Sequence, residues 1–332
     1  MAAQETIGVL GGGAWGTALA QVQARHGRNV TLWARNGAAV AEINDLHTNR
    51  AYLPGAKLAS TLTATGDLAS VAKAAILLLA TPAQQLRAVA GLVRPLLRAE
   101  HVLVICAKGI EQQSGLLLGQ VLSKELPGAA TAVLSGPGFA VEVVQGLPAA
   151  LTLGCRDEKL GRGLAGQLSH PEFRLYWSSD VTGVELGGAV KNVLAIAAGI
   201  VDGKQLGGSA HAALVSRGFA ELRRLGEAVG ARPETLMGLS GLGDLILTCG
   251  SSQSRNMSLG RDLGRGRALV EILGGRRAVT EGVATARAVQ QLAFKLGVEM
   301  PICAAVSAIL NGSVSVDAAI AQLLQRPLKA ED

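Results

Sequence analysis

The feature that most constrains the fold is a glycine-rich turn close to the N-terminus. Residues 6–10 form a short apolar run of strand type, and residues 17–26 have helical character. The turn between them contains Gly11, Gly13 and Gly16. A second apolar run at residues 29–33 completes the order and size of one strand–helix–strand unit of about 30 residues. Such a beginning predicts a parallel sheet with helices on its faces.

The spacing of these glycines, Gly-x-Gly-x-x-Gly, has a chemical meaning. The first glycine permits a tight turn, the second lets a pyrophosphate approach the backbone, and the third lets helix and strand pack closely. The helix N-terminus adds free N–H groups and a partial positive charge. A glycine-rich turn without a ligand is the alternative, but the position between a strand and a helix favours a dinucleotide site.

The end of the second strand bears on the choice of dinucleotide. Sites that prefer NAD usually carry Asp or Glu about 20 residues after the glycines, where it binds the ribose 2′-hydroxyl. This chain has Arg35 there and no carboxylate. A guanidinium can pair with a 2′-phosphate, so we expect NADPH to be preferred, with NADH as the alternative. The other interpretation of Arg35 is a solvated surface side chain.

Strands and helices continue to alternate over the first half of the chain. Further runs of strand type lie at residues 75–80, 101–106, 131–134, 149–153 and 173–176. Helical segments lie between them at residues 84–97, 116–126 and 159–168. Thr81 is a candidate N-cap of the first of these helices, with Pro82 in its first turn. This alternation predicts an α/β, doubly wound, Rossmann-like parallel sheet.

The pattern changes near residue 180, after which we find no convincing strand. Helical segments are predicted at residues 180–201, 211–229, 283–296 and 304–310. We therefore expect two domains, a dinucleotide-binding domain over residues 1–179 and an all-helical substrate domain over residues 180–332.

Composition narrows the class of partner. Hydrophobic residues make up 49% of the 332 residues and charged residues 17%, which predicts a folded protein. The net charge is +6, with basic residues scattered rather than clustered, and this favours an anionic small molecule over nucleic acid. Aromatic residues amount to 3%, too few for stacking platforms on single-stranded nucleic acid.

Cysteines and apolar segments bear on metals and on location. Cys106, Cys155, Cys249 and Cys303 are far apart and form no C-x-x-C pair, so we expect no metal site and no disulfide framework. The N-terminus does not resemble a signal peptide, and the longest apolar segments, around residues 74–80 and 193–201, are too short to span a bilayer. These observations predict a soluble cytoplasmic protein without membrane insertion.

Candidate site residues follow two of the predicted strands. Lys108 comes after the strand at 101–106, and the turn Ser135-Gly136-Pro137-Gly138 comes after the strand at 131–134. Ligands of open α/β sheets bind outside the carboxyl ends of the strands, so both segments are expected at the ligand crevice. The alternatives are a surface lysine and a tight connection.

The helical half adds a second group of candidates. Gly188, Lys191, Asn192, Ala195 and Gly199 share one face of the helix at 180–201. This face either leaves room for a ligand or packs closely against another helix. Further along, Asp244 and Thr248 are one helical turn apart. Asp244 also has the alternative role of a helix cap.

Ser254-Arg255-Asn256 marks the start of another helix. Ser254 is a candidate N-cap, and Arg255 with the helix N–H groups would form a phosphate site, with a charged loop as the alternative.

Taken together, these residues resemble the bacterial-type NAD(P)-dependent glycerol-3-phosphate dehydrogenases, nearly from end to end. The resemblance is carried by the segments Gly11–Ala20, Asn49–Pro54, Ala107–Gly109, Ser135–Ala140, Leu186–Asn192, Gly241–Asp244, Ser254–Asn256 and Gly297–Ile302. It implies reversible reduction of dihydroxyacetone phosphate to sn-glycerol 3-phosphate for phospholipid synthesis. A homodimer is also expected.

The resemblance also implies a role for each matching residue. Lys191 would be the proton donor and acceptor, Lys108 would polarise the substrate, and Asp244 would support both lysines with Thr248 nearby. Substrate contacts are implied for Lys108, Gly136, Gly138, Lys191, Asn192, Asp244, Ser254, Arg255 and Asn256. Cofactor contacts are implied for Gly11, Gly13, Ala14, Trp15, Gly16, Arg35, Lys108, Ala140, Arg255, Val279 and Glu281.

The chain departs from the family pattern at two positions. Gly138 stands where the family usually has Ser or Thr, so a hydroxyl contact to the substrate is expected to be missing or replaced by a water, and Ala14 replaces a common Ser. Two other functions stay open on the residues alone. One is a 3-hydroxyacid or 2-dehydropantoate-type reductase, and the other is a nucleotide sensor without catalysis.

Overall fold

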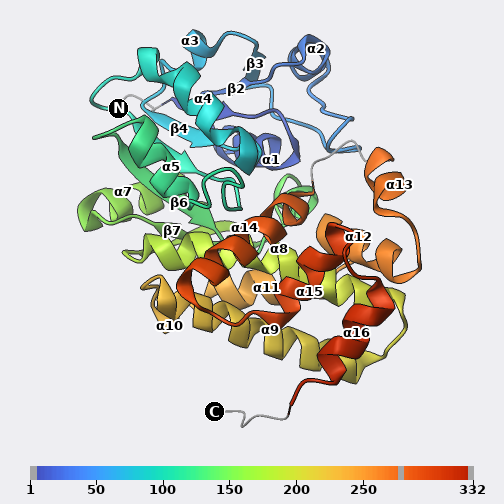
Figure 1. Cartoon of the computed structure of the whole chain (residues 1–332). Helices are drawn as coiled ribbons and strands as arrows, with labels where there is room; N and C mark the ends of the chain where they lie inside the picture. The colour runs from blue at the N-terminus through green and yellow to red at the C-terminus, as the bar shows by residue number, and fades with distance from the viewer. Residues whose placement is uncertain (1–5, 276–279, 328–332) are drawn as a thin grey trace.

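The first half of the chain builds one sheet with eight strands in the order β3-β2-β1-β4-β5-β6-β7-β8 (Figure 1). We describe a computed structural model, in which residues 6–275 and 280–327 are described. The strands are β1 (Ile7–Leu10), β2 (Val30–Trp33), β3 (Leu62–Thr65), β4 (Ile76–Leu79), β5 (Val102–Ile105), β6 (Ala130–Ser135), β7 (Ala149–Gly154) and β8 (Phe173–Ser178). The chain order reverses beside β1, and this is where open sheets of this type bind ligands.

The sheet differs from the expectation in two respects. Strands β1 to β6 are parallel, but β7 runs antiparallel to β6, and β8 is parallel to β7. The connection from β6 to β7 holds only the one-turn helix α6 (Ala140–Val143), which is too short for a parallel crossover. Strand β3 was not predicted, because its four residues, LTAT, contain only two apolar side chains at a sheet edge.

Helices cover both faces of the sheet. They are α1 (Ala14–Arg25), α2 (Gly37–Leu46), α3 (Leu68–Val71), η1 (Ala83–Gln85), α4 (Leu86–Val93), η2 (Arg94–Leu96), α5 (Leu118–Glu125) and α7 (Glu158–Leu168). The helix predicted at 84–97 is therefore divided, since Pro95 has no N–H to continue the α-helical pattern. Thr81 is not an N-cap, because its hydroxyl is buried and makes no hydrogen bond to a described residue.

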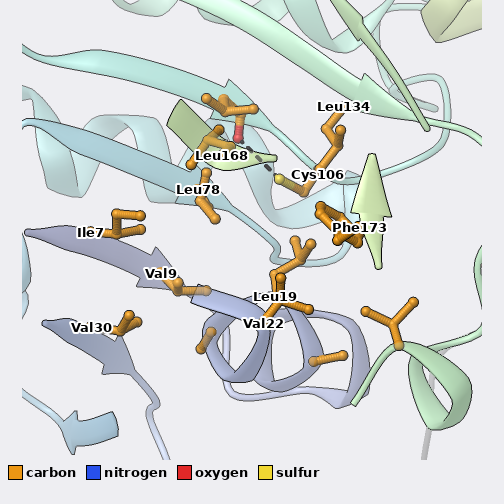
Figure 2. Close-up of a cluster of buried hydrophobic side chains, with 14 of the residues drawn as sticks. Ile7, Val9, Leu19, Val22, Val30, Leu78, Cys106, Leu134, Leu168 and Phe173 are labelled. Atoms are coloured by element: carbon orange, nitrogen blue, oxygen red, sulfur yellow. Dashed lines mark hydrogen bonds between the residues drawn. The ribbon is translucent and has the colours of Figure 1, made fainter. Parts of the chain in front are cut away.

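Two apolar cores lie on opposite faces of the sheet. Figure 2 shows one of them, where Leu19 and Val22 of α1 pack against Ile7, Val9 and other strand residues. The other core joins α4 and α5 to the alternate residues of the same strands. Along β4, Leu78 belongs to the first core while Leu77 and Leu79 belong to the second. Every residue of β4 is buried, as expected of a strand covered on both faces.

The second half contains helices and no strand within its described residues, 180–275 and 280–327. Its helices are α8 (Val181–Gly203), α9 (Gly208–Ala228), α10 (Pro233–Met237), the π-helical turn η3 (Leu239–Gly243), α11 (Asp244–Gly250), α12 (Arg255–Gly264), α13 (Leu269–Gly274), α14 (Glu281–Leu296), α15 (Pro301–Leu310) and α16 (Val316–Leu324). Helix α8 lies between the sheet domain and the other helices, and it contacts β6, β7, α9, α11, α12 and α14 (Figure 1).

Helix α8 is apolar enough and long enough to resemble a membrane-spanning segment, contrary to the expectation that every apolar segment is too short. Its 18-residue apolar window lies entirely inside the protein. The glycines of this helix and of α12 let the two backbones approach closely. A Cβ added to Gly199 would lie 2.0 Å from the carbonyl oxygen of Met257, and one added to Gly260 would lie 2.0 Å from that of Ile196. Close helix packing therefore explains Gly199 on the small-residue face.

Candidate functional site

Lys108 reaches from the sheet domain into the seam with the helical domain. It follows β5, and its Nζ donates to the carbonyl oxygen of Gly136 at 2.7 Å and to Oδ2 of Asp244 at 2.6 Å. Asp244 is the first residue of α11, so this contact joins residues 136 positions apart. The candidate lysine at the strand end and the candidate carboxylate of the helical half therefore meet.

Lys191 binds the other oxygen of the same carboxylate. Its Nζ donates to Oδ1 of Asp244 at 2.8 Å and to the hydroxyl of Thr248 at 2.8 Å. Thr248 lies one turn after Asp244 on α11, with 3.3 Å between its Oγ1 and Oδ1 of Asp244. The side chains of Lys191 and Asp244 are 10% and 1% exposed, so the pair is held away from solvent. Asp244 thus pairs with two lysines rather than capping a helix.

The buried charges shift each other's protonation. Burial lowers the pKa of Lys191 to about 8, with a further decrease from the charge of Lys108 and an opposing increase from Asp244. For Asp244, burial alone would raise the pKa, but the charges of Lys108 and Lys191 outweigh it and hold the pKa below its ordinary value. The site therefore holds an ionised carboxylate beside an amine that can release a proton near neutral pH.

Asn192 and Asn256 form a second polar group at the meeting point of α8, α12 and α14. The side-chain amide of Asn256 donates to Oδ1 of Asn192 at 2.8 Å, and its own Oδ1 accepts from the N–H of Gly282 at 3.0 Å. Ser254 caps α12 by accepting from the N–H of Met257 at 3.2 Å, as predicted. Arg255 is exposed at the first residue of α12.

The glycine-rich turn has the shape that its spacing predicts. A Cβ added to Gly16 would lie 2.0 Å from the carbonyl oxygen of Gly11, and Gly11 has a φ of +129° close to the backbone of Ala80. Beside Gly13 a Cβ would meet nothing within 4 Å. The turn is therefore closed on the side of the sheet and open at Gly13.

Trp15 connects this turn to the lysine site. Lys108 Nζ lies 5.9 Å from the centre of the Trp15 ring. The Trp15 Nε1 is buried and has no hydrogen-bond partner among the described residues. A Cβ on Gly138 would lie 3.5 Å from Cη2 of Trp15, an ordinary contact, so this position has room for a Cβ. Ala140 begins α6 directly after this turn.

Glu281 reaches the sheet domain from the first residue of α14. Its Oε1 accepts from the N–H of Ala83 at 3.1 Å, while its Oε2 is buried without a partner among the described residues. Burial raises the pKa of this carboxyl. Val279, the other predicted cofactor contact of this segment, lies outside the described residues.

Arg35 stands apart from the lysines. It is exposed after β2, whereas Lys108 follows β5, with β1 and β4 between these strands. Three inter-strand spacings correspond to roughly 14 Å. An extended dinucleotide would span that distance, and Lys108 Nζ is directed instead to Gly136 and Asp244.

Among the buried polar residues to which the sequence assigns no role, Asn49 lies beside the glycine-rich turn. Asn49 is completely buried, and its amide donates to the carbonyl oxygen of Gly12 at 3.0 Å. The segment that contains it carried the family resemblance but no recognisable chemistry. The sequence shows only an Asn in a loop, and the fold shows that it is buried and what it contacts.

The fold and site together define a class of protein. A doubly wound sheet with a glycine-rich turn at its carboxyl edge, completed by a helical domain that supplies a buried lysine, is the architecture of a two-domain dinucleotide-dependent dehydrogenase. The chain matches the N-terminal model of the NAD-dependent glycerol-3-phosphate dehydrogenases over residues 6–161 and the C-terminal model over residues 180–321. It belongs to this family.

Relatives and solved structures agree with this assignment. The chain is 56% identical to a glycerol-3-phosphate dehydrogenase (NAD(P)+) of Parvibaculum lavamentivorans, covering 99% of both proteins. It is 57% identical to that of Caulobacter vibrioides over 98% of this chain and 99% of the relative. The crystal structure of glycerol-3-phosphate dehydrogenase from Coxiella burnetii superposes with a TM-score of 0.93 at 39% identity, covering 97% of this chain and 99% of that one. A ketopantoate reductase from Ralstonia eutropha, at 16% identity and a TM-score of 0.61, shares the fold alone.

Proposed function

We propose that the protein interconverts dihydroxyacetone phosphate and sn-glycerol 3-phosphate with NADPH or NADH. The observation that carries this proposal is the buried network in which Asp244 binds Lys108 and Lys191 at the carboxyl edge of the sheet. A ketone that accepts a hydride develops negative charge on its oxygen, and this network offers positive charge and a proton.

The residues at the turn fit the dinucleotide that the family implies. Gly13 leaves open space at the start of α1, where backbone N–H groups bind phosphate. The buried Nε1 of Trp15 and Oε2 of Glu281 lack partners within residues 6–275 and 280–327, and they would face polar groups of the bound coenzyme. Gly11, Gly16, Ala14, Lys108, Ala140, Arg255 and Val279 complete the proposed coenzyme contacts. When bound, the coenzyme supplies the hydride.

Each lysine keeps one N–H for the substrate. An ammonium has three N–H donors, and Lys191 uses two of them on Asp244 and Thr248. Lys108 likewise uses two, on Gly136 and Asp244. The remaining donors would bind the ketone oxygen, and Lys191 would deliver its proton there during reduction and recover it during oxidation.

The phosphate end of the substrate would be held by the second polar group. Asn192, Asn256 and Arg255 lie at or beside the start of α12, where the helix dipole and N–H groups favour an anion. Ser254 would act by capping this helix, and Gly136 and Gly138 would form the wall beside Lys108. Fixing the phosphate orients the carbonyl toward the lysines.

The same proposal covers the domain boundary, the coenzyme preference, the oligomeric state and the location of the protein. We place the domain boundary between residues 179 and 180, because β8 ends at Ser178 and α8 begins at Val181. The exposed guanidinium of Arg35 supports a preference for NADPH through its 2′-phosphate. Supply of glycerol phosphate for phospholipid synthesis, a homodimeric state and a cytoplasmic location remain predictions.

The decisive experiment follows oxidation of the reduced coenzyme by purified protein. Dihydroxyacetone phosphate is compared with unphosphorylated dihydroxyacetone, and NADPH with NADH. We expect turnover with the phosphorylated ketone to exceed that without phosphate by roughly a hundredfold or more, because remote binding energy orients the reacting carbonyl. Equal rates with both ketones would contradict the proposal and favour a hydroxyacid-type reductase. Coenzyme binding without any turnover would favour a sensor.

A further inference from the structure

Asn49 is hydrogen-bonded to the glycine-rich turn and to the helix that follows it. Its Nδ2 donates to the carbonyl oxygen of Gly12 at 3.0 Å and to the hydroxyl of Thr17, in α1, at 2.9 Å. Asn49 is 0% exposed, and its Oδ1 has no partner among the described residues. The two N–H groups of the amide are therefore both committed to the turn and to the helix that follows it.

The backbone around Asn49 is itself fixed. Glu42 of α2 accepts from the hydroxyl of Thr48 at 2.8 Å and from the N–H of Arg50 at 2.9 Å, on either side of Asn49. The carbonyl oxygen of Asn49 accepts from the N–H of Leu53 at 2.8 Å. Because the main chain around Asn49 is fixed, its side-chain amide has little freedom to move with the glycine-rich turn.

The hydrogen bond to Gly12 sets the orientation of a peptide group. In a planar trans peptide the C=O of Gly12 and the N–H of Gly13 point in opposite directions. Because Asn49 binds the carbonyl oxygen, the N–H of Gly13 points away from Asn49. A Cβ added to Gly13 itself would meet nothing within 4 Å, so space is open beside this residue. Glycine at 12 and 13 would otherwise let this peptide rotate easily.

We propose that Asn49 is a positioning residue for coenzyme binding, which locks the Gly12–Gly13 peptide with its N–H directed at the coenzyme pyrophosphate. This inference rests on the proposed placement of the pyrophosphate at the Gly11–Gly16 turn. Asn49 acts through the backbone and touches neither the coenzyme nor the reacting atoms. Its effect is therefore on coenzyme affinity and not on the chemical step.

The test replaces Asn49 by leucine, which has a similar branched shape without the donors. Loss of one oriented donor is expected to raise the KM for NADPH by about tenfold. The KM for NADH should rise by the same factor, since both coenzymes carry the pyrophosphate. The kcat and the KM for dihydroxyacetone phosphate should stay within about twofold, because the lysine site is unchanged.

Gln21 provides the matched control. Its side chain is a buried amide, 4% exposed, one turn after Thr17 on α1. Its Oε1 accepts from the N–H of Ala59 at 2.7 Å, in the segment between α2 and β3 that also contains Asn49. Gln21→Leu should lower the melting temperature without changing the KM for either coenzyme. If Asn49→Leu is too unstable to purify, Asn49→Ala removes the same donors and supplies the same comparison.

A further variant, Gly13→Val, separates the placement of the pyrophosphate from the role of Asn49. Gly13→Val is compatible with the backbone, since φ is −77° and no atom lies near its Cβ position, but the side chain would occupy the proposed pyrophosphate space. Unchanged coenzyme KM in Gly13→Val would reject the placement of the pyrophosphate. If Gly13→Val weakens coenzyme binding, but the coenzyme KM of the Asn49 variants is no higher than that of Gln21→Leu, only the role of Asn49 is rejected. A rise confined to one coenzyme would also reject it.

Discussion

Among single residues, Lys191 carries the proposed proton transfer. Replacing it with alanine should lower kcat by about a thousandfold, in the range lost with other general acids, while binding of NADPH stays nearly intact. Stopped-flow or steady-state assays give kcat, and fluorescence titration gives coenzyme affinity. Lys204, which ends the same helix and pairs with Asp317, is the control, and Lys204→Ala should leave kcat unchanged. Normal turnover in Lys191→Ala would remove Lys191 from the mechanism.

The same residue predicts opposite pH profiles for the two directions of the reaction. Burial lowers the pKa of Lys191 to about 8. Reduction needs the protonated amine, so its rate should be level below about pH 8 and fall above it. Oxidation needs the neutral amine, so its rate should rise through the same range. Initial rates measured in both directions across this range check the sign, and two parallel profiles would contradict the assignment.

At the scale of elements, the close packing of α8 on α12 sets the distance between the lysine and the phosphate site. Gly260→Ala would bring a methyl group to 2.0 Å from the carbonyl oxygen of Ile196. We expect a loss of about 2 kcal/mol in the free energy of unfolding, because the backbones must separate. The KM for dihydroxyacetone phosphate should rise by about tenfold as well.

An exposed helical glycine provides the comparison. A Cβ on Gly163 of α7 would meet nothing within 4 Å, so Gly163→Ala should raise the free energy of unfolding by about 0.5–1 kcal/mol. Urea unfolding and steady-state kinetics measure both effects. If Gly260→Ala resembled Gly163→Ala in stability and KM, the two helices would not be held together by this contact.

Helix α8 also stabilises the start of α5 across the domain seam. Oε1 of Glu185 accepts from the N–H of Gly119 at 2.7 Å, and burial raises the pKa of this carboxyl from 4.5 to about 7. The folded protein therefore binds more protons here than the unfolded chain between these two values. Its stability should fall by about 3 kcal/mol as pH rises through that interval, and no further above it.

Glu185→Gln keeps an acceptor for Gly119 but does not titrate. Urea unfolding at about pH 5 and pH 8 should show that the variant lacks this part of the pH dependence. The exposed carboxylate of Glu158, which pairs with Arg162, gives a control in which Glu158→Gln should leave the slope unchanged. If the free energy of unfolding depended on pH identically in the parent protein and in Glu185→Gln, the assignment would be contradicted.

At the scale of the whole molecule, features that depend on local sequence patterns were predicted better than features that depend on contacts between distant segments. The turn at Gly11 to Gly16 is encoded within one strand–helix unit, and its position was predicted correctly. Strand β3 escaped prediction because it depends on pairing with β2 and not on its own apolar content. The antiparallel β7 depends on the length of a loop, which a search for alternating strands and helices does not weigh.

The candidate site shows the same limit. Residue types nominated Lys108, Lys191 and Asp244, but their meeting around one carboxylate depends on how two domains pack. The function of Asn49 depends on a carbonyl oxygen 37 positions earlier in the chain. Its partner is a main-chain group, so the residue types of the sequence do not reveal this contact.

The division of Asp244 between lysines from both halves of the protein has one more consequence. Oδ2 of Asp244 belongs to Lys108 of the sheet domain and Oδ1 to Lys191 of the helical domain. If the two halves separate, Lys108 moves away from Asp244 and no longer repels the charge of Lys191. Both oxygens of Asp244 can then stabilise protonated Lys191, which holds its proton more tightly. The acid strength of Lys191 is therefore a gauge of how closely the two halves of the protein meet.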